Sequence, residues 1–168
     1  MPVKPIVTYP NAILKTPAPT IGEIDDGIKQ LIEDLVDTMH AGPGSVGVAA
    51  PQIGVSLRAC VIDVSKNRHG KDNNHGLLLM INPQILEPSG SAVMREGCMS
   101  VPDYTGDVER ATELTLRYTD PDGVVREFVA SGFEAVAIQH EVDHLDGMLF
   151  LDRITSLKTG LFRRKSYK

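Results

Sequence analysis

The sequence has few cysteines, no long apolar run and no internal repeat, and each absence excludes a class of protein. Its longest uninterrupted apolar run covers only residues 77–81, whereas a membrane-spanning helix needs about 20 apolar residues. Two cysteines, Cys60 and Cys98, allow at most one disulfide, far below the density of a secreted disulfide scaffold. The N-terminal segment resembles neither a secretion signal nor a transit peptide. We therefore expect a cytoplasmic protein whose cysteines are thiols or metal ligands.

A chain of 168 residues, 42% hydrophobic and 23% charged, is suited to one folded domain. No linker divides it, so residues 1–168 are expected to form a single domain. The formal charge is −5, but residues 157–168 contain five Lys and Arg residues and no acidic one. A solvated, frayed end is the simpler interpretation of this basic tail. Contact with RNA or another anionic surface is the alternative.

The first part of the chain predicts an arm followed by a helix. Prolines are frequent in residues 1–20 and favour an extended or turning arm, because proline fixes its own φ and restricts the preceding residue. Apolar side chains then recur at helical spacing over residues 28–39. Asp25 or Asp26 is available as the N-cap, and the Gly-Pro pair at 42–43 is expected to end the helix.

The middle of the chain predicts antiparallel strands. Apolar or alternating runs at residues 59–64, 77–82 and 113–119 are bounded by turn residues. An Asp-Pro-Asp-Gly turn follows the third run and leads into residues 124–130, which indicates a hairpin. The polar, Gly- and Asn-rich segment 65–76 is expected to be an exposed loop without a catalytic role.

A second helix is predicted to begin near Ser131 and to end near Gly147. Ser131 and Glu134 have the spacing of a capping box, in which each side chain would bond the other residue's backbone N–H. A helix, several antiparallel strands and a second helix together predict an α+β fold rather than a parallel α/β one.

The predicted second helix contains the pattern His-Glu-x-x-His at residues 140–144. On a helix, His140 and His144 lie one turn apart on the same face, so both imidazoles can bind one metal ion while Glu141 moves a proton of an activated water. Two surface histidines on an acidic helix are the alternative. We favour the metal site because an apolar stripe, Phe133, Val136 and Ala137, leads into the two histidines and is expected to face the interior.

A catalytic metal site needs a third protein ligand, and the sequence restricts where it lies. After His144 the chain contains no His, Glu or Cys, and only Asp146 and Asp152 are available. The third ligand is therefore expected upstream, and Cys98 is the best candidate. It lies in residues 96–102, predicted to be an irregular, exposed segment. Cys60, within an apolar run, is expected to pack in the core.

Small residues fill the segment 44–52, Gly-Ser-Val-Gly-Val-Ala-Ala-Pro-Gln. Small side chains would let a substrate backbone lie close, and Gln52 offers an amide NH₂ as a donor. Taken alone, the segment is more typical of a tight turn into a strand.

Together, the segments 44–52, 96–100 and 139–144 resemble the three signature motifs of the peptide deformylases, in the same order. The resemblance covers residues 3–155. It implies an α+β fold in which antiparallel β-sheets surround a central metal-binding helix, with an N-terminal helix and a short C-terminal segment. It also implies a single catalytic domain that hydrolyses the N-formyl group from the initiator methionine of new polypeptides and releases formate.

The resemblance implies a role for each matching residue. Cys98, His140 and His144 would be the metal ligands, and Glu141 the general acid/base. Gln52 and the backbone N–H of Met99 would stabilise the oxyanion. The substrate would contact the backbone of Val46, Gly47 and Gly97, and its methionine side chain would enter a pocket lined by Met94, Phe133, Val136 and Ala137. A supporting ion-pair network would comprise Glu96, Arg110 and Asp143.

The resemblance also makes Fe²⁺ the expected native ion, although Zn²⁺, Ni²⁺ or Co²⁺ suits the same ligands and ligand chemistry alone favours zinc.

Three residues depart from the family pattern. Ser45 stands where the family usually has a glycine, and Met99 stands where it usually has a leucine or isoleucine. Thr105 is close to the position at which some members have an arginine that helps to position the peptide, which puts the affinity of this protein for longer peptides in doubt. The expected partners are formyl-methionyl peptides and nascent chains. A contact of the basic tail with ribosomal RNA, similar to that of C-terminal segments in some relatives, is a hypothesis.

Two other functions stay open on the sequence alone. One is a metal-dependent peptidase or another amidase, which the missing downstream ligand disfavours. The other is a catalytically silent metal-binding or ribosome-associated module, which the presence of Glu141 and Gln52 disfavours because a structural metal site needs neither.

Overall fold

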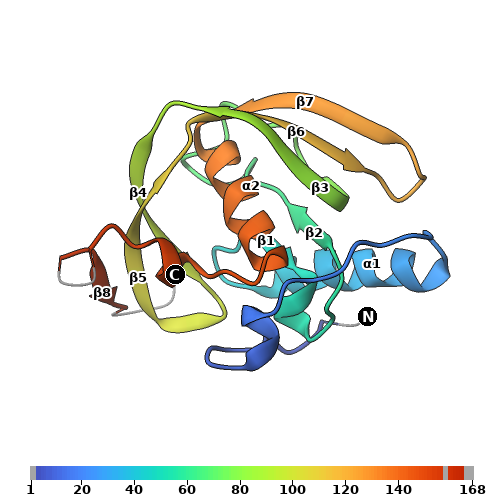
Figure 1. Ribbon diagram of the computed structural model, residues 1–168, viewed down its shortest axis with the longest axis horizontal. Helices are drawn as coiled ribbons and strands as arrows, with labels where there is room; N and C mark the ends of the chain where they lie inside the picture. The colour runs from blue at the N-terminus through green and yellow to red at the C-terminus, as the bar shows by residue number, and fades with distance from the viewer. Residues whose placement is uncertain (1–2, 157–158, 165–168) are drawn as a thin grey trace.

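The computed structural model describes residues 3–156 and 159–164, and Figure 1 shows the arrangement of their elements. The helices and strands follow the order α1 (Asp26–Ala41), β1 (Gly47–Ala49), β2 (Ala59–Ile62), β3 (Leu78–Ser89), β4 (Ala92–Cys98), β5 (Val101–Arg110), β6 (Glu113–Thr119), β7 (Val125–Ser131), α2 (Gly132–Leu145) and β8 (Leu161–Arg163). Short 3₁₀ turns are η1 (Ala12–Lys15), η2 (Ala50–Ile53) and η3 (Phe150–Arg153).

Two antiparallel sheets surround α2 (Figure 1). One sheet has the strand order β1-β2-β3-β6-β7, and the other has the order β4-β5-β8. The main core lies between the first sheet and α2, and a second apolar cluster joins α1 to β1 and β2. This architecture confirms the predicted α+β fold with a central helix. Within the described ranges, none of the helices is long and apolar enough to cross a lipid bilayer.

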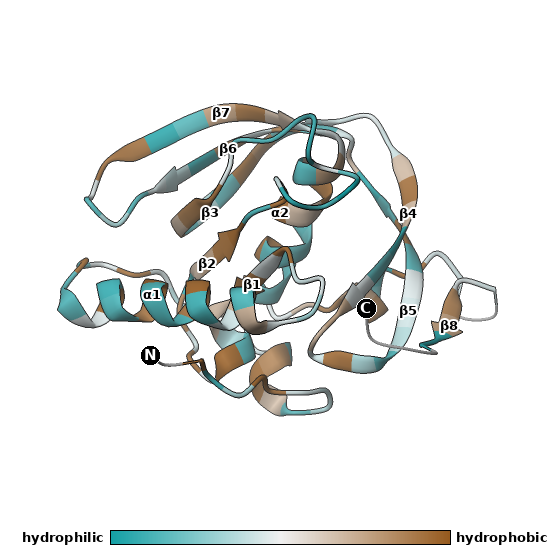
Figure 2. Cartoon of the chain, turned by 180° about the vertical axis from the view of Figure 1, so that it is seen from behind, coloured by the Kyte–Doolittle hydropathy of each residue, from teal (hydrophilic) through white to brown (hydrophobic). Residues whose placement is uncertain are grey.

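The helix α1 forms where the apolar spacing predicts it. The Asp25 carboxylate accepts a hydrogen bond from the Ile28 N–H at 3.0 Å, which satisfies one of the unpaired donors of the first turn. The helix ends at Ala41, and Gly42, before Pro43, is its C-cap. Leu35 and Met39 lie on its buried face, and Figure 2 shows the alternation of apolar and polar residues along it.

The central helix α2 begins after Ser131 as predicted, but the predicted capping box is wrong. The Ser131 hydroxyl accepts a hydrogen bond from Asn73, and the Glu134 carboxylate accepts one from the His75 N–H at 2.7 Å. The loop that precedes β3 therefore occupies both side chains. Residues 134–138 and 140–145 are buried, so burial extends nearly all round the helix. The buried surface is therefore wider than the single apolar stripe that the sequence predicted.

The strands are more numerous than the sequence predicts. The runs at 59–64, 77–82 and 113–119 all form strands, and β6 and β7 form the predicted hairpin. The expectation that residues 96–102 are irregular and exposed is wrong, because Cys98 ends β4, is only 8% exposed and lies next to the start of β5. The sequence did not predict β4 and β5, because β4 contains charged residues and β5 contains a proline. Their formation depends on the pairing of the two strands with each other.

The N-terminal arm connects two of the sequence motifs. As predicted, residues 3–20 form an extended arm, interrupted by η1. The Val7 N–H donates to the Gln52 carbonyl at 2.7 Å, and the Tyr9 N–H donates to the Ser100 carbonyl at 2.8 Å. These bonds hold the segment after β1 close to the segment after β4.

The described part of the basic tail is packed, so its interpretation as a frayed end is wrong for residues 159–164. Strand β8 pairs with β5, with Thr105 opposite Phe162 and Gly106 opposite Leu161. Lys158, Lys165 and Lys168 lie outside the described residues.

The N-cap of α1 provides a test of this fold. We expect Asp25→Ala to lower the free energy of unfolding by about 1 kcal/mol, because it leaves the Ile28 N–H without its acceptor. Urea denaturation followed by far-UV circular dichroism measures the change. Glu33→Ala, on the exposed face of the same helix, is the control, and an equal effect of both variants would contradict the capping role.

Candidate metal centre and active site

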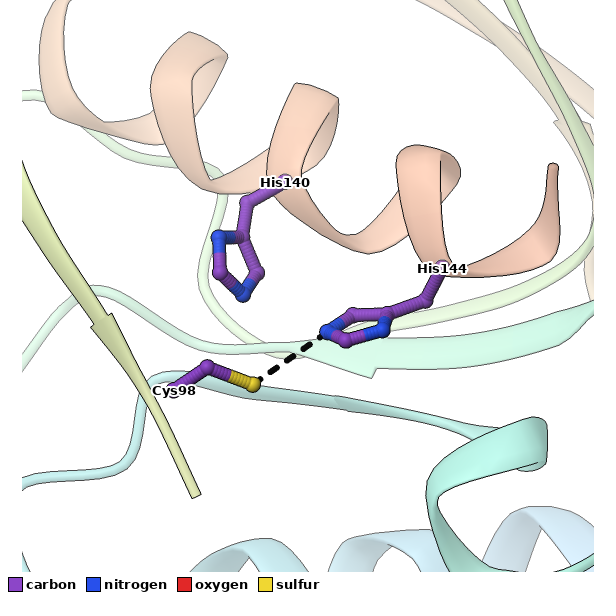
Figure 3. Close-up of side chains that lie close together, drawn as sticks. All are labelled: Cys98, His140 and His144. Atoms are coloured by element: carbon purple, nitrogen blue, oxygen red, sulfur yellow. Dashed lines mark hydrogen bonds between the residues drawn. The ribbon is translucent and has the colours of Figure 1, made fainter. Parts of the chain in front are cut away.

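Three buried side chains come together between β4 and α2. Cys98 points from the end of β4 toward His140 and His144 on α2 (Figure 3). Their possible ligand atoms all lie within 4.8 Å of one another, and Cys98 Sγ is 3.3 Å from His144 Nε2. Two such ligands on one tetrahedral zinc ion would lie about 3.6 Å apart. One thiolate and two imidazoles at these positions therefore fit a single divalent transition-metal ion.

The two histidine rings are prepared for metal binding in different ways. His140 Nδ1 is 2.9 Å from Glu96 Oε1, which leaves Nε2 toward the other two ligands (Figure 3). His144 Nδ1 is buried and, within the described part of the chain, has no hydrogen-bond partner. Burial lowers the pKa of His144 well below its usual value, and the neutral ring is the form that binds a metal ion.

A buried ion-pair network lies behind the ligands. Arg110 donates to both carboxylate oxygens of Glu96, at 2.7 and 2.9 Å, and to Asp143 at 2.6 Å. Burial opposes ionisation of Glu96, but hydrogen bonds with Arg110 and His140 outweigh it and lower the pKa of Glu96 to about 2. The ionised Glu96 therefore fixes the orientation of the His140 ring.

Asp143 has a further partner that the sequence did not indicate. Arg153, in η3, donates to both oxygens of this carboxylate, at 2.5 and 3.0 Å. In the sequence Arg153 resembles any surface cation after a helix, and no periodicity or motif distinguishes it.

Glu141 lines the same cavity as Cys98 and His140 and is 3% exposed. Its carboxylate lies against Gly47, where an added Cβ would be only 2.8 Å from Oε2. Oε1 is buried and lacks a hydrogen-bond partner among the described residues. Burial raises the pKa of Glu141 to about 7, so this carboxyl group is suited both to accept and to donate a proton near neutral pH.

Gln52 is held with its amide NH₂ toward the cysteine. Its Oε1 accepts a hydrogen bond from the Ala49 N–H at 3.0 Å, which fixes the orientation of the amide. Nε2 donates to Ser100 Oγ at 3.1 Å and lies 3.3 Å from Cys98 Sγ. The side chain is 1% exposed, so this donor is preorganised beside the metal ligands.

These groups face a cavity of about 220 Å³. Most of the residues expected to bind substrate line it, namely Val46, Gly47, Gly97, Met99, Phe133, Val136 and Ala137. Met94 is not among its lining residues. Its place in the methionine pocket therefore stays a prediction.

Four further lining residues were not expected, namely Pro43, Asn67, Arg95 and Arg164. Asn67 belongs to the polar loop 65–76, for which no catalytic role was expected. Arg164 follows β8 in the basic tail, and its proximity to the cavity depends on the pairing of β8 with β5. Side-chain type and local pattern give no signal for either residue.

Comparison of the chain with known proteins identifies the family to which it belongs. Residues 3–160 match the family model of the polypeptide deformylases. The chain belongs to the peptide deformylase family. This deformylase is 42% identical to a peptide deformylase of Syntrophobacter fumaroxidans, over 98% of this chain and 94% of that protein. It is 39% identical to one of Thermodesulfovibrio yellowstonii, over 98% of this chain and 97% of that protein.

Solved structures show the same fold. The peptide deformylase of Ehrlichia chaffeensis in complex with actinonin has a TM-score of 0.86 and 34% identity, with coverage of 94% of this chain and 92% of that one. The Met-Ala-Ser-bound peptide deformylase of Acinetobacter baumannii has a TM-score of 0.84 and 37% identity, with coverage of 90% and 98%. This deformylase is therefore a metal-dependent hydrolase that removes the N-formyl group from nascent peptides.

Cysteine substitutions provide a test of the metal centre. We expect Cys98→Ala to weaken divalent-ion binding by more than about 100-fold, because loss of a direct ligand should exceed the effect of losing a residue that only orients one. Metal content after dialysis against a competing chelator, measured by mass spectrometry, checks this. Cys60→Ala is the matched control, since Cys60 is fully buried in the core on β2. Retention of the ion by folded Cys98→Ala protein would exclude Cys98 as a ligand.

Proposed function

We propose that Cys98, His140 and His144 hold the catalytic ion of this deformylase and that Glu141 is its general acid/base. The observation that supports this most directly is the position of Glu141, which lines the cavity beside two of the three ligands and has a carboxylate oxygen without a partner among the described residues. A purely structural metal site has no use for such a group.

The ion held by Cys98, His140 and His144 would supply Lewis-acid chemistry to a water molecule and to the formyl group. Glu141 accepts the proton of the attacking water and then delivers it to the leaving amine nitrogen, so that formate and a free amino terminus result. Gln52 Nε2 and the Met99 backbone N–H donate to the formyl oxygen as negative charge develops on it.

The substrate backbone is proposed to lie along Val46, Gly47 and Gly97. Its methionine side chain then enters the apolar part of the cavity at Phe133 and 136–137, which suits an unbranched thioether. The relative from Acinetobacter baumannii has a structure with Met-Ala-Ser bound, which supports methionyl peptides as ligands here. We also propose that the chain works as one catalytic domain in the cytoplasm.

We propose Fe²⁺ as the native ion, on the basis of the family resemblance. The donor set of one thiolate and two imidazoles also accepts Zn²⁺, Ni²⁺ or Co²⁺, so protein for activity assays is best purified without oxygen.

The reaction is tested by formate release from formyl-Met-Ala-Ser with metal-loaded protein. We expect Glu141→Gln to lower kcat by about 10²- to 10⁴-fold, the usual contribution of a general acid/base, with the metal content unchanged. Glu134→Gln is the control, because this buried carboxylate on the same helix bonds with His75 instead. A wild-type kcat in the Glu141→Gln variant would exclude Glu141 as the general acid/base. Absence of formate release by the metal-loaded wild type would overturn the proposed activity.

We further propose that the basic tail, residues 157–168, contacts ribosomal RNA. The support is its five cations without an acidic residue, since clustered cations gain affinity by displacing counterions from phosphates. Deleting the tail would also remove β8 and, with it, Arg164 from the lining of the cavity, so neutralising the charges is the better test.

In the triple variant Lys158→Gln, Lys165→Gln and Lys168→Gln, we expect co-sedimentation with ribosomes at low salt to fall about tenfold, because three cationic contacts are lost. Formate release from a short peptide should not change. A second triple variant at the exposed residues Lys4, Lys29 and Lys71 has the same net charge. Equal co-sedimentation of both variants would overturn a specific role for the tail.

A further inference from the structure

The C-terminal strand brings a cation to the wall of the catalytic cavity. Arg164 directly follows β8, and its backbone N–H donates to the Asp103 carbonyl at 2.8 Å, which extends the contact between β8 and β5. Figure 1 shows β8 beside β5, at the edge of the smaller sheet. The Arg164 side chain is half-buried and lines the cavity together with the metal ligand Cys98.

The guanidinium of Arg164 lies directly against Gly97. A Cβ built on Gly97 would be 2.3 Å from Arg164 Nη2 and 3.3 Å from Thr105 Cγ2. Any side chain at residue 97 would therefore displace the guanidinium. Because Gly97 immediately precedes Cys98, this places a positive charge next to the β4 edge along which the peptide is proposed to run.

A second arginine reinforces this charge. Arg95 also lines the cavity, and its guanidinium lies 3.5 Å from the centre of the Phe162 ring on β8. Asp107 Oδ1 lies 3.6 Å from Arg95 Nε and partly compensates the charge of Arg95. The two acidic residues of the cavity lining are held elsewhere, because Glu96 is bound by Arg110 on both oxygens and Glu141 is buried against Gly47. Two guanidinium groups, those of Arg95 and Arg164, therefore line this side of the cavity.

On the basis of the function proposed above, we propose that Arg164 is a specificity-determining residue that binds a carboxylate of the peptide beyond the methionine. A guanidinium recognises a carboxylate through two parallel N–H···O bonds, which give both affinity and orientation. This carboxylate is either the side chain of an acidic residue or the C-terminus of a short peptide. The apolar part of the cavity at Phe133 and Val136 is left for the methionine side chain.

The test compares kcat and KM of formate release for three peptides. Formyl-Met-Ala-Ser amide has no carboxylate, formyl-Met-Ala-Ser has a C-terminal one, and formyl-Met-Asp-Ser amide has one on a side chain. We expect the wild type to have a KM about tenfold lower for at least one carboxylate peptide than for the neutral amide. The peptide with the lower KM identifies the source of the carboxylate. Absence of any such difference would overturn the proposal.

Arg164→Gln should abolish this difference by raising KM for the carboxylate peptide, with kcat and the hydrolysis of the neutral amide within about twofold of wild type. Arg164→Lys should retain part of the difference, because it keeps the charge but loses the two-bond geometry. Arg163→Gln is the matched control, since Arg163 is the exposed neighbour in β8 and is not among the lining residues.

Two results would overturn the proposal while formate release continues. One is an undiminished carboxylate preference in Arg164→Gln, and the other is an equal loss of preference in Arg163→Gln, which would indicate a general effect of tail charge. Failure of the wild type to release formate from all three peptides would instead overturn the proposed function, so the two failures are distinguishable.

Discussion

The buried guanidinium of Arg110 is the group on which the geometry of the site depends. It binds Glu96 on β4 and Asp143 on α2 at the same time, and so connects the smaller sheet to the central helix where the proposed metal ligands meet. Removing charges from water costs several kcal/mol per ion, and this cost is offset only when all partners are present. Loss of one partner leaves an uncompensated buried charge, typically at a cost of about 3–5 kcal/mol. Stability of the fold and orientation of His140 are therefore properties of the same network.

The position of α2 explains why such a network is needed. A helix that is buried nearly all round must place its polar residues in the interior, and on α2 these include His140, Glu141, Asp143 and His144. Each requires a partner or pays for desolvation. Asp143 and His140 have ionic partners, whereas Glu141 and His144 each have an atom without one among the described residues. These two side chains are the ones proposed for proton transfer and metal binding. Each of these roles needs an atom that no other group of the protein already binds.

The sequence predicted those features that depend on local pattern. Helical spacing and the Asp25 cap predicted α1, and the Asp-Pro-Asp-Gly turn predicted the β6–β7 hairpin. The His-Glu-x-x-His spacing, together with the lack of downstream ligands, identified the three residues that the structure brings together. Features that depend on pairing between distant segments were missed. The sequence of β4 is typical of a loop, and the strand forms because it pairs with β5. Ser131 and Glu134 have the spacing of a capping box, but their side chains bond with Asn73 and His75 instead.

Two glycines illustrate how the cavity combines local sequence with distant contacts. From the sequence, small residues near Gly47 and Gly97 were expected to let a substrate backbone approach closely. In the structure each also makes room for a charged side chain from another segment, since Gly47 faces the Glu141 carboxylate and Gly97 faces the Arg164 guanidinium. A Cβ at either position would be within 3.0 Å of a charged group and would force it to move. The two glycines therefore make room for the carboxylate proposed as the acid/base and for the guanidinium on the cavity wall, at the places where the substrate backbone is proposed to lie.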